Sequence, residues 1–138
     1  MWDWKEYIIL ATQLVPSSFT LPSDEARVRS VVSRAYYGAY HSAREYAIHN
    51  NLYALKGPRD RPKHGDVWQS FFQRQCSDDE KQAGRLGDAL MADRHIADYE
   101  MNLRALSKVG HSAIQRAHEI RRLLGYPPLP PARVAPPP

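Results

Sequence analysis

The stretch ARVRSVVSRAYYGAYHSAREY, residues 26–46, decides the fold of this 138-residue chain. Its apolar and small side chains recur every three or four residues, which is the period of an amphipathic α-helix. Placed 100° apart, they form one narrow stripe, with Gly38 and Ser42 at its edge: Val28, Val32, Ala35, Ala39, Ala43 and Tyr46. A stripe of small side chains predicts a long helix against which a second helix packs closely.

Capping residues mark where this helix begins and ends. Ser23 is a good N-cap, and acidic residues 24 and 25 suit the positive end of a helix. Asn50 and Asn51 can terminate it. Ser77 is the expected cap of a later helix, and Gly125 marks the end of the last one. By the same criteria we expect a loop over residues 51–63 and further helices over residues 2–14, 65–73, 77–101 and 103–124.

No alternation of apolar and polar residues predicts a strand. The sequence therefore predicts an all-α fold, an antiparallel up-down bundle of four to five helices over residues 1–125. Residues 126–138 form a Pro-rich tail, expected to adopt polyproline II structure without a core of its own. Residues 128–133, PLPPAR, have the Pro-x-x-Pro-x-Arg form of an SH3-type ligand. The alternatives are a loose tail or one that docks on its own domain or on a partner.

Composition excludes several classes of protein. The single cysteine, Cys76, rules out a disulfide framework and a cysteine-based zinc site. No apolar run approaches the roughly 20 residues of a membrane span, and the first residues, MWDWKEY, do not resemble a secretory signal. We expect a cytoplasmic protein without membrane association, metal or other cofactor. The net charge of +4 permits a polyanionic partner such as RNA but does not require one.

Polar residues gather on the far side of the long helix. Arg34, Tyr37 and His41 are spaced by three and four residues, so they are surface neighbours in a sector about 60° wide. A cation, a phenol and an imidazole together could bind a phosphate and move a proton near neutral pH. The alternative is a solvated face that carries an aromatic ring.

The helix over residues 78–101 places a charge within its apolar stripe. Arg94 lies near the middle of the stripe formed by Ala83, Leu86, Leu90, Ala97 and Met101. A buried arginine is costly unless it is paired. Either Asp98, four residues on, pairs with Arg94 inside the core, or Arg94 opens into a groove between helices. Tyr99 projects away from the stripe.

The last helix has a clear core face, made of Leu106, Gly110, Ala113, Ala117, Ile120 and Leu124. Arg104, His111, His118 and Arg122 lie on the opposite side. This basic ribbon is either a solvated face or a contact surface for nucleic acid. His111 and His118 are seven residues apart, about 10 Å along a helix, which is too far for a shared metal.

Three motifs in this order resemble HEPN domains, the higher-eukaryote and prokaryote nucleotide-binding helical domains. The first is SRAYYGAYH, residues 33–41, which resembles the long helix of these domains. The second is KHG, residues 63–65, which resembles a short element that follows in one branch. The third is RHIADY, residues 94–99, which resembles the Arg-x-x-Ala-Asp-Tyr motif of that branch. Together they cover about residues 23–122.

The resemblance implies a helical bundle, usually a dimer with its active sites at the subunit interface. Many members are metal-independent ribonucleases, in which an arginine holds the phosphate, a histidine transfers protons and the 2′-OH of the RNA is the nucleophile. This branch often pairs with minimal nucleotidyltransferases in toxin–antitoxin systems. The resemblance implies catalytic roles for Arg94, Asp98, His41 and His64. For RNA or nucleotide binding we consider Arg34, Tyr37, His95, Tyr99, Arg104 and His111.

One position departs from the family pattern. The hallmark is an arginine followed by a histidine after four to six intervening residues, but the residue five positions after Arg94 is Tyr99. Arg104 and His111 meet the spacing near the last helix junction. The expected function is therefore a metal-independent RNA-cleaving toxin or defence component. The alternative is a non-catalytic HEPN module that binds a nucleotidyltransferase or another partner, and a nucleotide sensor is a third interpretation.

Overall fold

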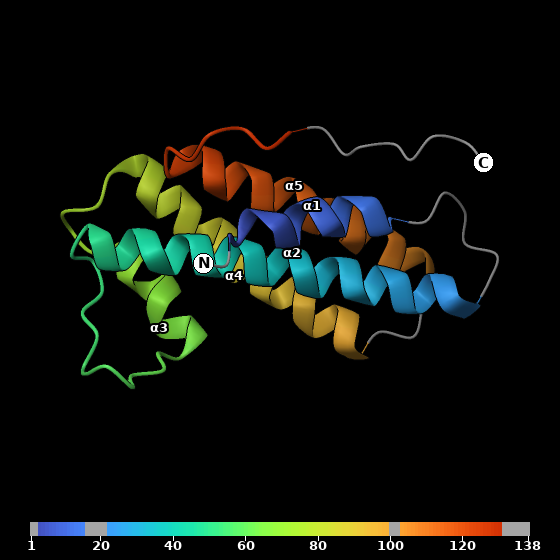
Figure 1. Cartoon of the computed structure of the whole chain (residues 1–138), viewed down its shortest axis with the longest axis horizontal. Helices are drawn as coiled ribbons and strands as arrows, with labels where there is room; N and C mark the ends of the chain where they lie inside the picture. Colours follow the sequence, from blue (N-terminus) through green and yellow to red (C-terminus); the bar gives the residue numbers. More distant parts are fainter. Residues whose placement is uncertain (1–2, 16–21, 100–102, 131–138) are drawn as a thin grey trace.

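A computed structural model describes residues 3–15, 22–99 and 103–130, and Figure 1 shows them as a bundle of helices. No strand occurs within these ranges, so the predicted all-α bundle is confirmed. The helices are α1 (Lys5–Leu14), α2 (Pro22–His49), α3 (His64–Gln69), α4 (Asp78–Tyr99) and α5 (Leu103–Leu123), with a 3-10 turn η1 (Ser70–Phe72) after α3.

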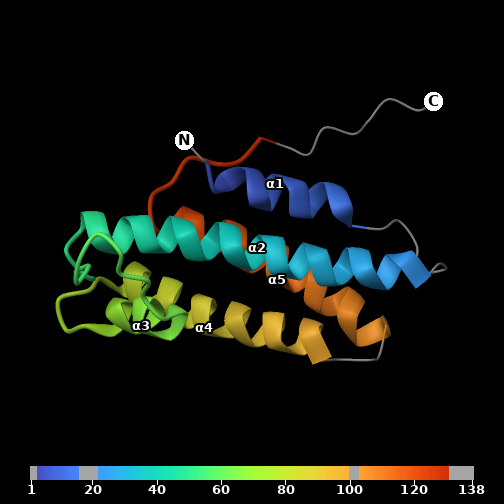
Figure 2. The ribbon, with the colours of Figure 1, turned by 60° about the horizontal axis from the view of Figure 1, so that its bottom comes forward.

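Helix α2 is the centre of the bundle. It packs against α1, α4 and α5, and α4 also packs against α5. Figure 2 shows α1 on one side of α2 and α4 on the other, with α3 beside the first half of α4. The long helix that the sequence identified first therefore contacts all the others.

The predicted apolar stripes form most of the core. Every predicted core residue of the last helix is buried, from Leu106 to Leu124, and so is the small-residue stripe of α2 from Val28 to Ala43. Tyr46, at the end of that stripe, is only partly buried. Met101, predicted at the end of the α4 stripe, lies outside the described residues. The regular spacing of these residues predicted their burial because each helix turns one face inward.

Two glycines let helices approach more closely than any side chain would permit. A Cβ atom at Gly38 would lie 2.6 Å from Ile8 Cγ1 and 2.9 Å from the Trp4 carbonyl oxygen. A Cβ atom at Gly87 would lie 2.1 Å from the ring of Trp68. The lack of a side chain at Gly38 thus lets α1 pack closely on α2, and the lack of one at Gly87 lets α3 pack closely on α4.

The helix ends follow the predicted capping residues closely. The Glu80 amide donates to Ser77 Oγ (3.1 Å) and the Ser77 amide donates to Glu80 Oε1 (2.9 Å), which is a capping box before α4. Asn51 adopts a positive φ of 59° after α2, and Gly125 adopts a φ of 80° after α5. Both residues therefore end their helices in the left-handed conformation, as the sequence predicted.

The beginnings of two helices differ from the prediction. Helix α2 begins at Pro22, so residue 23 lies inside the helix and not at its N-cap. Proline suits the first turn because it has no amide hydrogen to leave unsatisfied. Helix α1 begins at Lys5, three residues later than predicted. No helix in the described part of the chain combines the length and apolar character that a membrane crossing needs.

The chain after α5 packs back onto the bundle. Tyr126 donates its hydroxyl hydrogen to the Ser42 carbonyl oxygen (2.8 Å), and Leu129 is partly buried against the core. In Figure 2 this segment passes the start of α1. Residues 127–130 therefore follow the docked alternative, and residues 131–138, including Arg133 of the SH3-like motif, lie outside the described part.

Candidate functional site

Aromatic and imidazole rings from three helices gather at the junction of α1, α2 and α3, next to α4. Consecutive turns of α2 supply tyrosines and a histidine, α3 begins with a histidine, and an arginine reaches over from α4. We call this group the aromatic–histidine cluster, and it consists of Trp4, Tyr36, Tyr37, Tyr40, His41, His64 and Arg94.

His64 lies at the middle of the cluster. Its ring stacks on Tyr40 with centroids 3.8 Å apart, and it lies perpendicular to the ring of Tyr37 with centroids 5.9 Å apart. Its Nδ1 atom shares a hydrogen bond of 2.7 Å with the Tyr36 hydroxyl group. The ring is thus fixed by contacts with three tyrosines, and its Nε2 atom makes no hydrogen bond within the described residues.

Arg94 covers the neighbouring tyrosines from α4. Its guanidinium carbon lies 4.8 Å from the ring centroid of Tyr37 and 5.2 Å from that of Tyr36. These are cation–π distances. No ion pair joins Arg94 to a carboxylate in the described part of the chain. Its charge is therefore free to meet an external anion.

Burial changes the proton affinities of the cluster. The pKa of Tyr36 is raised to about 12, chiefly by burial, although the charge of Arg94 opposes this shift. Burial lowers the pKa of His64, and the nearby charge of Arg94 lowers it further. At neutral pH the Tyr36 phenol therefore keeps its proton, whereas His64 is an unprotonated imidazole that can accept one.

His41 occupies the side of the cluster next to α1. Its ring stacks on Trp4 with centroids 3.7 Å apart and lies edge-on to Tyr40 at 5.0 Å. Burial is the main reason that its pKa falls to about 4, and the charges of Arg44 and His64 add to the effect. Its Nδ1 atom is buried and has no hydrogen-bond partner within the described residues. His41 is therefore neutral at physiological pH.

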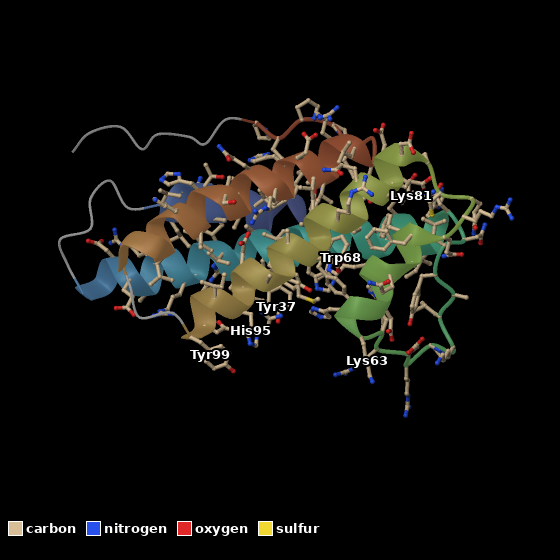
Figure 3. The ribbon with its side chains drawn as sticks, turned by 180° about the vertical axis from the view of Figure 1, so that it is seen from behind. Tyr37, Lys63, Trp68, Lys81, His95 and Tyr99 are labelled. Carbon is tan, nitrogen blue, oxygen red and sulfur yellow. The ribbon has the colours of Figure 1, made fainter. Side chains whose placement is uncertain are left out.

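Several predicted site residues lie apart from the cluster. His95 and Tyr99 are exposed and contact one another at 4.9 Å, and Figure 3 shows both at the outer edge of α4. His111 is exposed on α5, and within the described residues no contact joins it to the cluster. The side chain of Arg104 lies outside the described part. Arg34 is half-buried on α2, and its buried Nε atom makes no hydrogen bond in the described part of the chain.

The predicted pairing of Arg94 with Asp98 is absent. Asp98 is exposed, and the buried carboxylate of α4 is Asp93, which pairs with Arg116 from α5. The helical turn explains the difference, because Asp93 faces α5 whereas Asp98 faces solvent. Of the two alternatives for Arg94, the internal ion pair is therefore wrong. Arg94 instead rests on the tyrosines of α2.

Three members of the cluster were not singled out from the sequence. Tyr36 and Tyr40 are four residues apart on α2 and lie beside Tyr37 and His41, so helical spacing alone could have grouped them. Trp4 precedes α1, and only the packing of that helix against Gly38 brings its ring onto His41. No pattern in the sequence predicted that Trp4 belongs to the aromatic–histidine cluster.

The described residues contain no cluster of three or more histidine, cysteine, aspartate or glutamate side chains that could hold a metal ion. Comparisons of this chain with protein-family models, with curated proteins and with solved structures found no match. What the cluster can do is therefore inferred from its own chemistry. It offers an arginine without a carboxylate partner in the described part of the chain, two neutral imidazoles, and two phenols, Tyr36 and Tyr40, whose pKa is raised by burial.

Proposed function

We propose that this protein is a HEPN-type, metal-independent RNA-cleaving protein that acts as a toxin or defence component. The observation that supports this best is the position of Arg94. It contacts Tyr36 and Tyr37, has no carboxylate partner in the described part of the chain, and lies close enough to His64 to lower the pKa of that histidine. An unpaired guanidinium beside a neutral imidazole suits a phosphodiester substrate.

In the proposed reaction Arg94 binds the non-bridging oxygens of the scissile phosphate. His64 accepts the proton of the RNA 2′-hydroxyl group, whose oxygen attacks the phosphorus atom. The bond to the 5′-oxygen breaks, solvent supplies that oxygen with a proton, and the products are a 2′,3′-cyclic phosphate and a 5′-hydroxyl end. The Tyr36 hydroxyl group orients His64 through its hydrogen bond at Nδ1.

The other residues of this region have supporting roles in the proposal. Tyr37 holds Arg94 and offers a ring face against which a base can stack. Arg34 and His95 would contact the RNA on either side of the cleavage position. His41, neutral and stacked on Trp4, forms the side of the cluster next to α1. Asp98 is too exposed to orient Arg94 as first expected.

The test is cleavage of transfer RNA and mixed cellular RNA in the presence of EDTA. We expect the wild-type protein to cleave and His64→Gln to lose about a hundredfold or more of the rate, which is typical of a lost general base. His118→Gln is the matched control, because His118 is another histidine with a pKa lowered by burial but lies on α5. Equal rates for wild type and His64→Gln would remove His64 from the mechanism.

The pH dependence of this reaction follows from the His64 pKa. Because burial and Arg94 lower that pKa below its usual value of about 6.5, the base form predominates at pH 7. The cleavage rate should fall as the pH decreases through the lowered pKa and stay level from pH 7 to pH 8. A rate that instead fell above pH 7 would indicate that a protonated histidine is required.

One observation favours the alternative, a non-catalytic HEPN module that binds a nucleotidyltransferase or another protein. Ile96 is 42% exposed and Tyr99 is 73% exposed on the outer side of α4, where Tyr99 replaces the histidine of the family hallmark. Exposed apolar side chains of this kind are typical of protein contacts. A complex with a co-expressed minimal nucleotidyltransferase, formed without RNA cleavage and lost in Tyr99→Ser, would support this function instead.

A further inference from the structure

A second arginine without an ion-pair partner in the described part of the chain lies in the last turn of α5. Arg121 is 7% exposed, and no carboxylate forms an ion pair with it in the described part of the chain. Its Nη1 atom donates to Ser42 Oγ (2.7 Å), and its guanidinium carbon lies 4.6 Å from the ring centroid of Tyr126. Its Nε atom is buried and meets no acceptor among the residues that the structure describes.

This arrangement leaves a buried positive charge largely uncompensated. A guanidinium carries five N–H donors, and Arg121 donates a single hydrogen bond within the described residues. Burying an ionised group is costly unless an opposite charge or a full set of hydrogen bonds compensates it. Ser42 and the ring of Tyr126 supply neither an opposite charge nor enough acceptors. The missing component is an anion.

Arg121 also lines an open cavity. The cavity has a volume of about 490 Å³, which is within the range of small-ligand sites. It lies where residues 127–130 pass the start of α1, a region that Figure 1 shows beside the last turn of α5. Besides Arg121, its walls include Trp4, Lys5, Tyr126, Pro128 and Leu129. The cavity thus joins two cations to apolar and aromatic surfaces.

The two carboxylates at this cavity already have partners. Asp3 pairs with Lys5 (2.8 Å), and Glu45 Oε1 accepts a hydrogen bond from Trp4 Nε1 (2.9 Å). Both acids are exposed, whereas Arg121 is buried. The charges of both carboxylates act to raise the pKa of Arg121, but burial is the larger effect and lowers it, and neither carboxylate forms an ion pair with Arg121.

We propose that this cavity binds a small organic anion, with a carboxylate or phosphate group on Arg121 and an apolar body against Trp4, Pro128 and Leu129. Arginine is suited to both head groups because its planar donors can bind two oxygens at once. The inference does not depend on the proposed RNA cleavage, because Arg121 belongs to neither the phosphate nor the proton-transfer machinery. It gives the docked proline segment a role as one wall of a binding site.

The test uses the full chain and three probes of similar size. Benzoate and phenyl phosphate carry the two candidate head groups, and benzyl alcohol carries none. We expect calorimetry to detect at least one anion and to show that it binds about tenfold or more tightly than benzyl alcohol. The stronger of the two anions identifies the head group. Equal binding of benzyl alcohol, or no binding of either anion up to about 10 mM, would overturn the proposal.

Two variants assign the binding to Arg121. Arg121→Met should weaken binding of the preferred anion by about tenfold or more. Arg122→Met is the matched control, because Arg122 is the next residue but is exposed and paired with Glu119. Equal binding by Arg121→Met and wild type would place the anion elsewhere. Should Arg121→Met not fold, the side-chain Nε–H resonance of Arg121 in the wild-type protein must shift during the titration, and an unmoved resonance refutes the site.

Discussion

At the scale of single residues, an arginine that lies in an apolar stripe can be explained by ring contacts and not by an ion pair. Arg94 is half-buried, rests on Tyr36 and Tyr37, and has no carboxylate partner in the described part of the chain. Cation–π contacts of this kind contribute about 0.5–2 kcal/mol. They hold the guanidinium in place while leaving its hydrogen-bond donors for a ligand.

The substitution Arg94→Met separates structure from function. Methionine keeps the apolar stem of the side chain and removes the charge, so we expect the free energy of unfolding to fall by about 1 kcal/mol or less. RNA cleavage should be lost. Urea unfolding and the cleavage assay measure the two effects, and Arg85→Met, an exposed arginine of the same helix, is the control. A folded Arg94→Met protein with undiminished cleavage would exclude a catalytic role for Arg94.

The pKa of His41 predicts a loss of stability in acid. The pKa is about 4 in the folded protein and about 6.5 when unfolded, so between these values the unfolded chain binds the additional proton. The stability that neutral His41 contributes to the folded state is fully present above about pH 6.5 and is lost as the pH falls toward 4. Because the ring is partly exposed, we expect a loss of about 2 kcal/mol.

The variant His41→Phe isolates that effect. Phenylalanine can stack on Trp4 but does not titrate, so the free energy of unfolding should depend less on pH between 7 and 4 than in wild type. Urea unfolding at several pH values provides the comparison. Parallel curves for the two proteins would show that His41 is not the group that titrates.

At the scale of helices, close contact through glycine decides where the aromatic–histidine cluster forms. Gly38 brings the start of α1 against α2, and this contact carries Trp4 onto His41. Gly87 leaves space for Trp68, which is fully buried between α3 and α4 and thus holds His64 at the start of α3. Figure 3 shows Trp68 in this position. The glycines therefore position both histidines indirectly.

The substitution Gly38→Ala tests this dependence. Its Cβ atom would meet the Trp4 carbonyl oxygen at 2.9 Å, and a backbone atom cannot move away without shifting α1. We expect the free energy of unfolding to fall by about 1–3 kcal/mol. Gly65→Ala is the control, because no atom lies within 4 Å of its added Cβ and alanine favours a helix. Equal stability of both variants in urea would mean that α1 adapts freely.

At the scale of the whole molecule, the outer surface of α4 exposes large apolar side chains to solvent. Ile96 and Tyr99 are both exposed there, while the α4 residues Ala83, Leu90 and Ala97 are buried. The resemblance to HEPN domains implies a dimer. We therefore propose a second copy of this chain as the partner for this surface.

Light scattering at micromolar concentration tests the dimer. We expect a mass of two chains, and we expect the double variant Ile96→Ser, Tyr99→Ser to shift the population toward a single chain because apolar contact area is removed. Leu55→Ser is the matched control, because Leu55 has the same 42% exposure as Ile96 but lies in the loop before α3. A single-chain mass for the wild-type protein would count against the homodimer.

The sequence by itself determined the helices and their inward faces. Periodic apolar residues predicted the stripes of α2 and α5, and Ser77, Asn51 and Gly125 predicted three helix boundaries, because these features depend on neighbours within a few residues. It also identified Arg94, His41 and His64 as candidates. The sequence did not predict what each candidate contacts, because local spacing places a residue on a helix face without showing which helix packs there.

Only the tertiary structure decided which side chains contact the candidate residues. Asp98 is in reach of Arg94 along the helix, yet packing turned Asp93 toward Arg116 and left Arg94 against tyrosines from α2. Arg121 is a second example. Its burial depends on Ser42, which is distant in the chain, and on Tyr126, which follows the end of α5. The energy of a charge depends on its surroundings in three dimensions. The roles of the two arginines could therefore be inferred only from the packed helices.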